Sequence, residues 1–534
     1  MVGWLRRLSA RLCRPWLRPA RVLRLTTRPE ETTVNCGATA RPDVAQGLNL
    51  SAFSMPGRVA GLTQLWLDVP WWQLRPRVVQ QLAREGWRWC WLGRGEIVVG
   101  LPTLLVAYLR AAQIVWQRGR RRLGWERAPR LPPLPTTTKS EVRPGPRRIL
   151  HYLKTCLQGG VERQAAYLAA EQRRAGYDVR VVYQLPSIAE PDSAHDWFHA
   201  AGIAPRCLAD VHVPPDLAAL PSVLAEQVAA LRPVLDDFQP DVLHCWVDDA
   251  NVAGLWAGCA AGVPAIILTS LGLSPQRCPQ VRTPWMRPLY QAGLQRPRVR
   301  LVCISDFGIQ DYADWLGVPS NRLDRVRIGV PSVPEIAPEA RLAFRQGLGI
   351  PPESLLVGGL FRLEPDKRPL LFLEVVHRLA RAVPGLHALH VGGGSLAGQF
   401  DAEVARRSLT GRVHRLGRVE NALLPLAACD VMLLTSAAEG TPNVALEAQA
   451  LGVVPVLTDV GGCRETLADG VTGRLMPTDD VDGMVSVLHE VLTDAAGRRR
   501  MAAAGPSFVA EHYGLARFVA DFTAVYDAAL GSRS

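Results

Sequence analysis

Two acidic side chains bracket a polar loop and the start of a helix in the last third of the chain. Glu439 lies in the loop at residues 436–442, and Glu447 lies about one turn inside the helix predicted to begin at Asn443. Free N–H groups at a helix start bind anions such as phosphate, and a carboxylate accepts paired hydrogen bonds from neighbouring sugar hydroxyls. The arrangement indicates a nucleotide-sugar site. Four further residues of this segment are expected to contact the phosphates: Thr441, Pro442, Asn443 and Val444.

A pair of cations follows an earlier predicted strand. Arg362 and Lys367 lie five residues apart across a turn that contains Pro365. Two cations directed at a diphosphate stabilise it as a leaving group without a metal. Lysine is rare in this chain, since Lys139, Lys154 and Lys367 are its only lysines among 61 basic residues. A lysine at position 367 is therefore not what the preference for arginine alone would give.

Two glycine-containing turns are expected to approach the same ligand. Gly159 and Gly160 join a predicted strand at 149–155 to a helix at 161–175. Glycines at a strand-to-helix turn let the backbone come close to a phosphate. Gly393, after the predicted strand at 388–391, is a further donor-side candidate.

Polar residues also follow the predicted strand at 241–246. His244 is a candidate acid–base residue, although a single histidine at a strand end is more often structural. Asp248 and Asp249 could bind acceptor hydroxyls or cap the next helix. Glu162, just after the glycine turn, is the remaining acceptor-side candidate.

These residues need parallel strands that end at a common edge. Short β-branched runs alternate with amphipathic helical stretches from residue 147 to about 330, and the pattern then restarts. This predicts an α/β protein with two Rossmann-like, doubly wound domains facing a cleft, where strand ends and helix starts converge.

The motifs resemble those of family-4 retaining glycosyltransferases of GT-B fold. Residues 439–448 match the pattern E-G-x-P-x-x-x-x-E-A, and the following glycines and Glu465 fall where that family has G-G-x-x-E and D-G-x-x-G. Residues 361–368 and 159–163 resemble its G-R-L-x-x-x-K-G and G-G-x-E-R segments. The resemblance implies a donor on the second domain, with Glu439 on a sugar hydroxyl and Glu447 on the ribose.

The same resemblance implies a metal-independent, retaining transferase of the hexosyltransferase type with no cofactor. UDP-sugars are the favoured donors, with GDP-sugars next, and the acceptor is a glycan or a lipid-linked sugar; no nucleic acid is expected. The chain departs from the family at Phe361 and Arg368, where glycine is usual, and at Trp246, where many relatives have a second histidine. The last departure leaves the acid–base group unassigned.

Five segments are predicted along the chain. They are a basic N-terminal extension at 1–127, a Pro-rich linker at 128–146, an acceptor domain at 147–335, a nucleotide-sugar domain at 336–515 and a C-terminal helix at 516–534 that packs back on the first domain. Asp480 and Asp482 form a D-x-D sequence that could bind a metal, but their position at a helix start favours capping.

The net charge of +12 is unevenly distributed, because basic residues far outnumber acidic ones before residue 147 and not after it. Most of the 15 Trp also lie in this extension. Two interpretations stay open: an ordinary basic small domain, or an interfacial helix over 1–25 and an apolar run at 97–109 that contact an anionic membrane. The 11 scattered Cys indicate a reducing compartment, so we expect a cytoplasmic protein at the inner membrane face.

Two other functions are compatible with the same architecture. One is a nucleotide-sugar epimerase, which the pair of glutamates disfavours. The other is a catalytically degenerate, membrane-bound scaffold, which Trp246 favours and the intact Glu439, Glu447, Arg362 and Lys367 disfavour.

Overall fold

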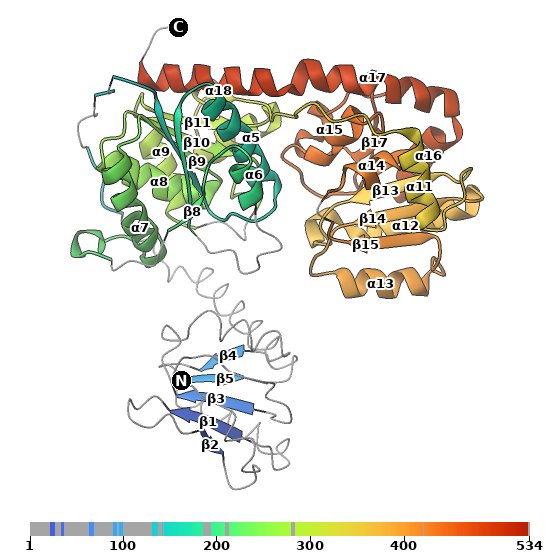
Figure 1. Cartoon of the computed structure of the whole chain (residues 1–534), viewed down its shortest axis with the longest axis horizontal. Coiled ribbons are helices and arrows are strands. Elements are labelled where there is room, and N and C mark those ends of the chain that lie inside the picture. Colours follow the sequence, from blue (N-terminus) through green and yellow to red (C-terminus); the bar gives the residue numbers. More distant parts are fainter. Residues whose placement is uncertain are drawn as a thin grey trace. The chain divides into compact units, whose positions relative to one another are not determined.

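The computed structural model forms two units, residues 1–127 and 128–534 (Figure 1). The described residues are 22–26, 34–36, 64–68, 89–92, 96–99, 131–136, 141–142, 144–184, 194–208, 213–278, 283–419 and 421–531.

In the first unit the described residues form one five-stranded sheet of order β2-β1-β3-β5-β4. Its strands are β1 Val22–Thr26, β2 Val34–Cys36, β3 Gln64–Asp68, β4 Trp89–Leu92 and β5 Glu96–Val99. β1 and β3 are parallel, and the other neighbours are antiparallel. The predicted interfacial helix and apolar run overlap β1 and β5 at one end each and otherwise lie outside the described residues, so membrane contact stays a prediction.

The second unit begins with a parallel seven-stranded sheet of order β12-β11-β10-β9-β6-β7-β8. Its strands are β6 Arg148–Leu153, β7 Asp178–Tyr183, β8 Arg206–Cys207, β9 Val242–Trp246, β10 Ala265–Ser270, β11 Val299–Cys303 and β12 Asp324–Arg325. The helices between them are α5 Gly160–Arg174, α6 His195–His199, α7 Ser222–Phe238, α8 Asp248–Ala260, α9 Met286–Leu294 and α10 Asp306–Leu316. Both faces of the central strands are buried, as their near-continuous Val, Ile and Leu runs predict.

A second parallel sheet follows, of order β15-β14-β13-β16-β17-β18. Its strands are β13 Leu356–Leu360, β14 His387–Val391, β15 Val413–Gly417, β16 Val431–Leu434, β17 Val454–Thr458 and β18 Arg474–Met476. The helices are α11 Pro338–Gly347, α12 Pro369–Ala382, α13 Ala397–Arg406, α14 Leu423–Ala427, α15 Asn443–Ala450, α16 Val481–Thr493 and α17 Ala495–Tyr513. The prediction of two tandem doubly wound domains is confirmed.

Each sheet reverses its strand order at one place, between β6 and β9 in the first and between β13 and β16 in the second. Loops that leave neighbouring strands at such a switch point diverge and expose the strand ends to ligands. The glycine turn follows β6, Asp248 follows β9, Lys367 follows β13 and Glu439 follows β16. The topology therefore accounts for the spacing of the motifs along the chain.

We call the part of the second unit around the seven-stranded sheet the first domain, and the part around the six-stranded sheet the second domain. The last helix, α18 Leu515–Leu530, follows the second domain in the chain and packs on the first domain (Figure 1). Phe518, Phe522 and Tyr526 are buried in one apolar cluster with residues of β6, β9 and α5. Arg517 donates hydrogen bonds to the carbonyls of Arg327 and Ile328, just after β12. The C-terminal segment is thus part of the core of the first domain.

Part of the predicted Pro-rich linker is packed against the same domain. Leu134 is buried, and Arg296 donates hydrogen bonds to the carbonyl oxygens of Leu134 at 2.9 Å and Pro135 at 2.6 Å. The segment therefore does not act as a free spacer at these residues. Among the helices of the described ranges, none has both the length and the apolar character that a membrane crossing requires.

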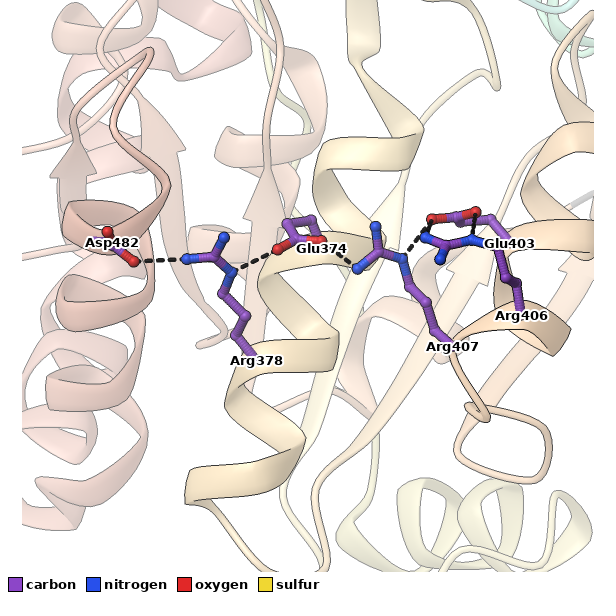
Figure 2. A network of polar contacts seen from close by, with 6 residues as sticks. All are labelled: Glu374, Arg378, Glu403, Arg406, Arg407 and Asp482. Carbon is purple, nitrogen blue, oxygen red and sulfur yellow. Dashed lines mark hydrogen bonds and ion pairs between the residues drawn. The ribbon is translucent and has the colours of Figure 1, made fainter.

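A chain of partly exposed ion pairs joins three helices of the second domain (Figure 2). It runs from Asp482 on α16 through Arg378 and Glu374 on α12 to Arg407 and Glu403 next to and on α13, and ends at Arg406. Hydrogen bonds from its arginines, Arg406 first, lower the pKa of Glu403 to about 2. Asp482 is thus paired with Arg378, and Asp480 accepts the Gly483 N–H at 3.0 Å as the cap of α16. Asp480 therefore has the capping role that its position predicted.

Candidate active site

Glu439 lies at the centre of a compact polar cluster after β16. Its Oε1 accepts a hydrogen bond from Lys367 Nζ at 2.6 Å and one from Ser436 Oγ at 2.5 Å. Only 9% of the Glu439 side chain and 16% of the Lys367 side chain are exposed. A buried carboxylate needs such partners to offset its lost hydration. The structure therefore brings together two predicted site residues that are 72 positions apart.

The loop that carries Glu439 is fixed by close backbone packing. Gly462 N donates to Glu439 O at 3.2 Å. Gly461 has φ +54°, and a Cβ there would lie 1.9 Å from Glu439 O. Only glycine fits this contact, so the G-G pair predicted from the family pattern serves to hold the Glu439 loop.

The start of α15 presents polar atoms that have no partner within the described residues. Thr441 Oγ1 and Asn443 Oδ1 are both buried there without a hydrogen bond. Buried polar groups in proteins nearly always have a partner. These two atoms, together with the backbone N–H groups of Asn443 and Val444 at the helix start, are therefore the groups in this loop best placed to bind a ligand.

Glu447 on α15 forms an ion pair with Arg163 on α5, so it connects the two domains. The Arg163 guanidinium also lies 5.3 Å from the centroid of the Trp197 ring. The glycine turn lies close by, because a Cβ on Gly160 would come within 2.5 Å of Asn443 Nδ2. Gly159 caps α5 with an extended backbone. The glycine turn therefore lies beside the α15 loop, and its contact with the donor stays a prediction. Arg163 was not among the predicted site residues.

Arg362 lies at the carboxyl end of β13 and is largely exposed. Its nearest carboxylate is Asp366 at 3.7 Å, and 67% of its side chain is accessible to solvent. Leu363, the next residue, donates its N–H to Gly393 O at 2.9 Å, which places the Gly393 loop beside it. Arg362 therefore remains available to an anion, whereas most of the Lys367 side chain is buried.

The structure contradicts an acid–base role for His244. The ring is fully buried, its Nδ1 lies 2.7 Å from Tyr526 Oη, and its Nε2 lies 2.7 Å from Thr269 Oγ1. Burial lowers the pKa of His244 well below its ordinary value. Trp246 stacks on the His244 ring and donates its indole N–H to His151 Nδ1 at 3.1 Å. With both nitrogens engaged in the core, His244 is structural and cannot exchange protons with a substrate.

Two of the three acceptor-side candidates are also tied to the protein. Glu162 is buried, accepts a hydrogen bond from Thr155 Oγ1 at 2.6 Å, and has its pKa raised by burial. Asp248 accepts hydrogen bonds from Tyr290 at 2.6 Å and Tyr312 at 3.0 Å. Burial raises the pKa of Asp248 to about 6.

Asp249 is the most accessible of the three. It forms an ion pair with Lys154, and both side chains are partly exposed, at 27% and 39%. The two residues follow β9 and β6, which are neighbours at the switch point of the first sheet. Val247, which precedes the two aspartates, has φ +66° and ψ 159°, a conformation that β-branched residues rarely adopt.

A second carboxylate joins the two domains. Glu465, after β17, accepts the backbone N–H groups of Asp306 at 2.8 Å and Phe307 at 2.9 Å, at the start of α10. Ser305 caps the same helix by accepting the Gly308 N–H at 2.9 Å. A carboxylate is stabilised at a helix N-terminus. The sequence placed Glu465 in the G-G-x-x-E motif but gave no sign that it binds the other domain.

Comparison with known proteins agrees with this architecture. A family model described as Glycosyltransferase Family 4 matches residues 158–332, and one described as Glycosyl transferases group 1 matches residues 351–494. Together these matches cover more than half of the chain and correspond to the two sheets. The fold and the matches define a glycosyltransferase of GT-B architecture. The chain belongs to the family-4 glycosyltransferases, as the motifs indicated.

Solved structures share the fold of the second unit. The Anabaena HepE protein, in complex with UDP and glucose, is 19% identical, with a TM-score of 0.61 over 72% of this chain and 100% of that one. Sucrose-phosphate synthase from Thermosynechococcus elongatus is 17% identical with the same TM-score and the same coverage.

Curated relatives match over shorter stretches. The Vi polysaccharide biosynthesis protein VipC/TviE of Salmonella typhi is 29% identical over 263 residues, which are 49% of this chain and 46% of that protein. A D-inositol 3-phosphate glycosyltransferase of Stackebrandtia nassauensis is 34% identical over 199 residues, 34% of this chain and 44% of that protein. The chain thus spans less than half the length of these relatives.

Proposed function

We propose that this glycosyltransferase transfers a hexose from a nucleotide sugar, a UDP-sugar in preference to a GDP-sugar, to a glycan or lipid-linked acceptor. Transfer retains the anomeric configuration and needs neither a metal nor a cofactor. The observation that carries the proposal is the largely buried Lys367–Glu439 pair beside a helix start with two unpartnered polar atoms. Cations, backbone donors and a carboxylate then meet where a diphosphate joins a sugar.

The donor's phosphates bind the N–H groups at the start of α15, together with Arg362 and Lys367. As the bond between the sugar and the diphosphate breaks, negative charge grows on the leaving group, and preorganised cations stabilise it most in the transition state. Lys367 is fixed by its 2.6 Å hydrogen bond to Glu439. Arg362 is exposed and can be reached by the phosphates from solvent.

Glu439 and Glu447 bind hydroxyl groups on either side of the phosphates. Glu439 keeps lone pairs for a sugar hydroxyl besides those used by Lys367 and Ser436. Glu447 binds the ribose and shares its carboxylate with Arg163. The Arg163 contact then adds a residue of the first domain to the donor site.

The acceptor enters at the strand ends of the first domain, where Asp249 and Lys154 are the accessible pair. The names of two relatives, in polysaccharide biosynthesis and inositol-phosphate glycosylation, support a hydroxyl-rich acceptor. Surface polysaccharide or glycoconjugate synthesis is the process that fits best. The basic N-terminal unit would bring the protein to an anionic membrane surface on the cytoplasmic side.

A thermal-shift screen of nucleotide sugars tests the donor site. The best donor should raise the melting temperature of the parent and of Glu490→Ala, and should fail to raise that of Glu447→Ala and Lys367→Ala. Glu490 is a matched control, because it also forms an ion pair with an arginine, Arg474, in the same domain. If the best donor stabilises both site variants as well as the parent, the assignment is wrong.

The buried His244 and the unusual Trp246 favour one alternative, a degenerate protein kept as a scaffold. Absence of binding to any nucleotide sugar would support it. Release of a free sugar of altered configuration, without an acceptor, would instead support an epimerase.

A further inference from the structure

Arg368 departs from the family pattern in a way that the donor site does not explain. The family's G-R-L-x-x-x-K-G segment ends in glycine, and here Arg368 occupies that position directly after Lys367. Its backbone has φ 49° and ψ 56°, the left-handed conformation that glycine adopts readily and other residues rarely. The backbone shape of the family turn is therefore kept, although its usual residue is absent.

The Arg368 side chain makes contacts that glycine could not make. Its guanidinium donates to the carbonyl oxygens of Thr435 at 2.6 Å, Ser436 at 2.9 Å and Thr478 at 2.8 Å. It also forms an ion pair with Asp479 at 3.1 Å. Only 19% of this side chain is exposed. The guanidinium has five N–H donors in a rigid planar fork, which suits several carbonyls spread along one plane better than the compact ammonium of lysine does.

These carbonyls belong to the segment that presents Glu439. Thr435 and Ser436 follow β16 and are fully buried, and the Ser436 hydroxyl donates to Glu439. Thr435 Oγ1 returns the contact by donating to Lys367 O at 3.1 Å and Arg368 O at 3.2 Å. Arg368 thus joins the backbone that carries Lys367 to the backbone that carries Glu439.

We infer that Arg368 is a positioning residue for the donor diphosphate: it fixes the distance between the Lys367 turn and the Ser436–Glu439 loop, and through them the cation that binds phosphate. This inference rests on the proposed function. Misplacement of a binding group by about 1 Å can cost as much as 100-fold. Loss of the Arg368 side chain should therefore weaken binding of the phosphates and leave binding of the nucleoside unchanged.

Arg368→Gly is the most direct variant, because glycine suits the left-handed backbone and restores the family residue. UDP, GDP and ADP are first tested on the full-length parent. The diphosphate that binds most tightly, and the nucleoside it contains, are then used as the two probes. Calorimetry should show about a 10-fold loss of diphosphate affinity in Arg368→Gly. Ligand-observed NMR should show nucleoside affinity changed less than threefold.

Coupling to Lys367 separates positioning from general stability. Lys367→Ala removes the group that Arg368 is inferred to position, so adding Arg368→Gly should then cost less than threefold in diphosphate affinity. The same 10-fold loss in both backgrounds would overturn the inference. So would an unchanged diphosphate affinity in Arg368→Gly alone.

Arg345→Ala is the matched control. Arg345 donates to the carbonyls of Ala428 at 2.7 Å and Ser354 at 3.1 Å and pairs with Asp430 at 2.8 Å, in the same domain. These residues precede β16 and β13, whereas the donor site follows the two strands. Arg345→Ala should lower the melting temperature without weakening diphosphate binding; equal weakening would overturn the inference. If the parent protein binds none of the three nucleoside diphosphates, the proposed function itself is contradicted.

Discussion

The proposed donor half and the proposed acceptor half of this protein occupy equivalent places in their sheets but differ in what their side chains do. Both lie at a switch point, after β13 and β16 in one domain and after β6 and β9 in the other. In the donor half, Arg362 is exposed and Thr441 has an unpartnered hydroxyl. In the acceptor half, His244 and Trp246 are bonded into the core. A switch point therefore positions loops, and partners decide which side chains remain available.

Removing the charge of Glu439 should have the largest effect. Glu439→Gln keeps the shape but weakens the contact with Lys367, so we expect kcat/KM for the best nucleotide sugar to fall about 100- to 1,000-fold. Steady-state kinetics against Glu490→Gln as control measures it. A loss below threefold would mean that the Lys367–Glu439 pair does not act on the donor.

The buried histidines should make the first domain sensitive to acid. Burial lowers the pKa of His151 to about 4, against 6.5 when unfolded, so the unfolded chain binds more protons between these values. The free energy of unfolding should thus fall as pH drops from 6.5 to 4, by roughly 3 kcal/mol from His151 alone. Urea unfolding at several pH values measures this. His151→Gln should flatten the dependence, and an unchanged slope in that variant would contradict the assignment.

Restoring the family histidine at position 246 should not restore chemistry. Trp246→His loses a buried ring stacked on His244 and the hydrogen bond to His151, and should cost about 2 kcal/mol of stability with no gain in turnover. Trp256→His, in another apolar cluster of the same domain, is a control for loss of packing alone. Faster sugar transfer by Trp246→His would contradict this expectation and show that a histidine at position 246 can still act in catalysis.

Asp249 should affect the acceptor and not the donor. Asp249→Asn weakens the pair with Lys154, and we expect the acceptor KM to rise about 10-fold while the donor KM stays within twofold. Asp237→Asn, which alters an exposed pair with Arg180 in the same domain, should leave both constants unchanged. Equal changes in the donor KM and the acceptor KM would contradict the assignment of Asp249 to acceptor binding.

The partly exposed ion-pair chain in Figure 2 should matter least. Arg378→Ala breaks its links to Glu374 and Asp482, and we expect a loss below about 0.5 kcal/mol that shrinks further in high salt. Urea unfolding at low and high ionic strength measures it. A loss above about 1 kcal/mol would show that the chain acts as a cooperative network.

Much of the fold could be predicted from the sequence, because buried parallel strands consist of short runs of Val, Ile and Leu. The predicted strand at 265–270 agrees with β10, and the one at 454–458 with β17. The local part of the donor site was readable for a similar reason, since Glu439 and Glu447 lie on one loop and helix. What remained hidden depends on contacts between distant residues, such as Arg163 with Glu447, Glu465 with α10, and the engagement of His244 by Tyr526.

The return of α18 to the first domain constrains how the two domains can move. The chain crosses between them twice, once after β12 and once between α17 and α18, and the crossings touch where Val330 N donates to Tyr513 O at 2.8 Å. Two adjacent tethers leave one easy motion, a rotation about the line on which they lie. A rotation of this kind that separates the domains would break two contacts, the Arg163–Glu447 ion pair and the hydrogen bonds from the start of α10 to Glu465.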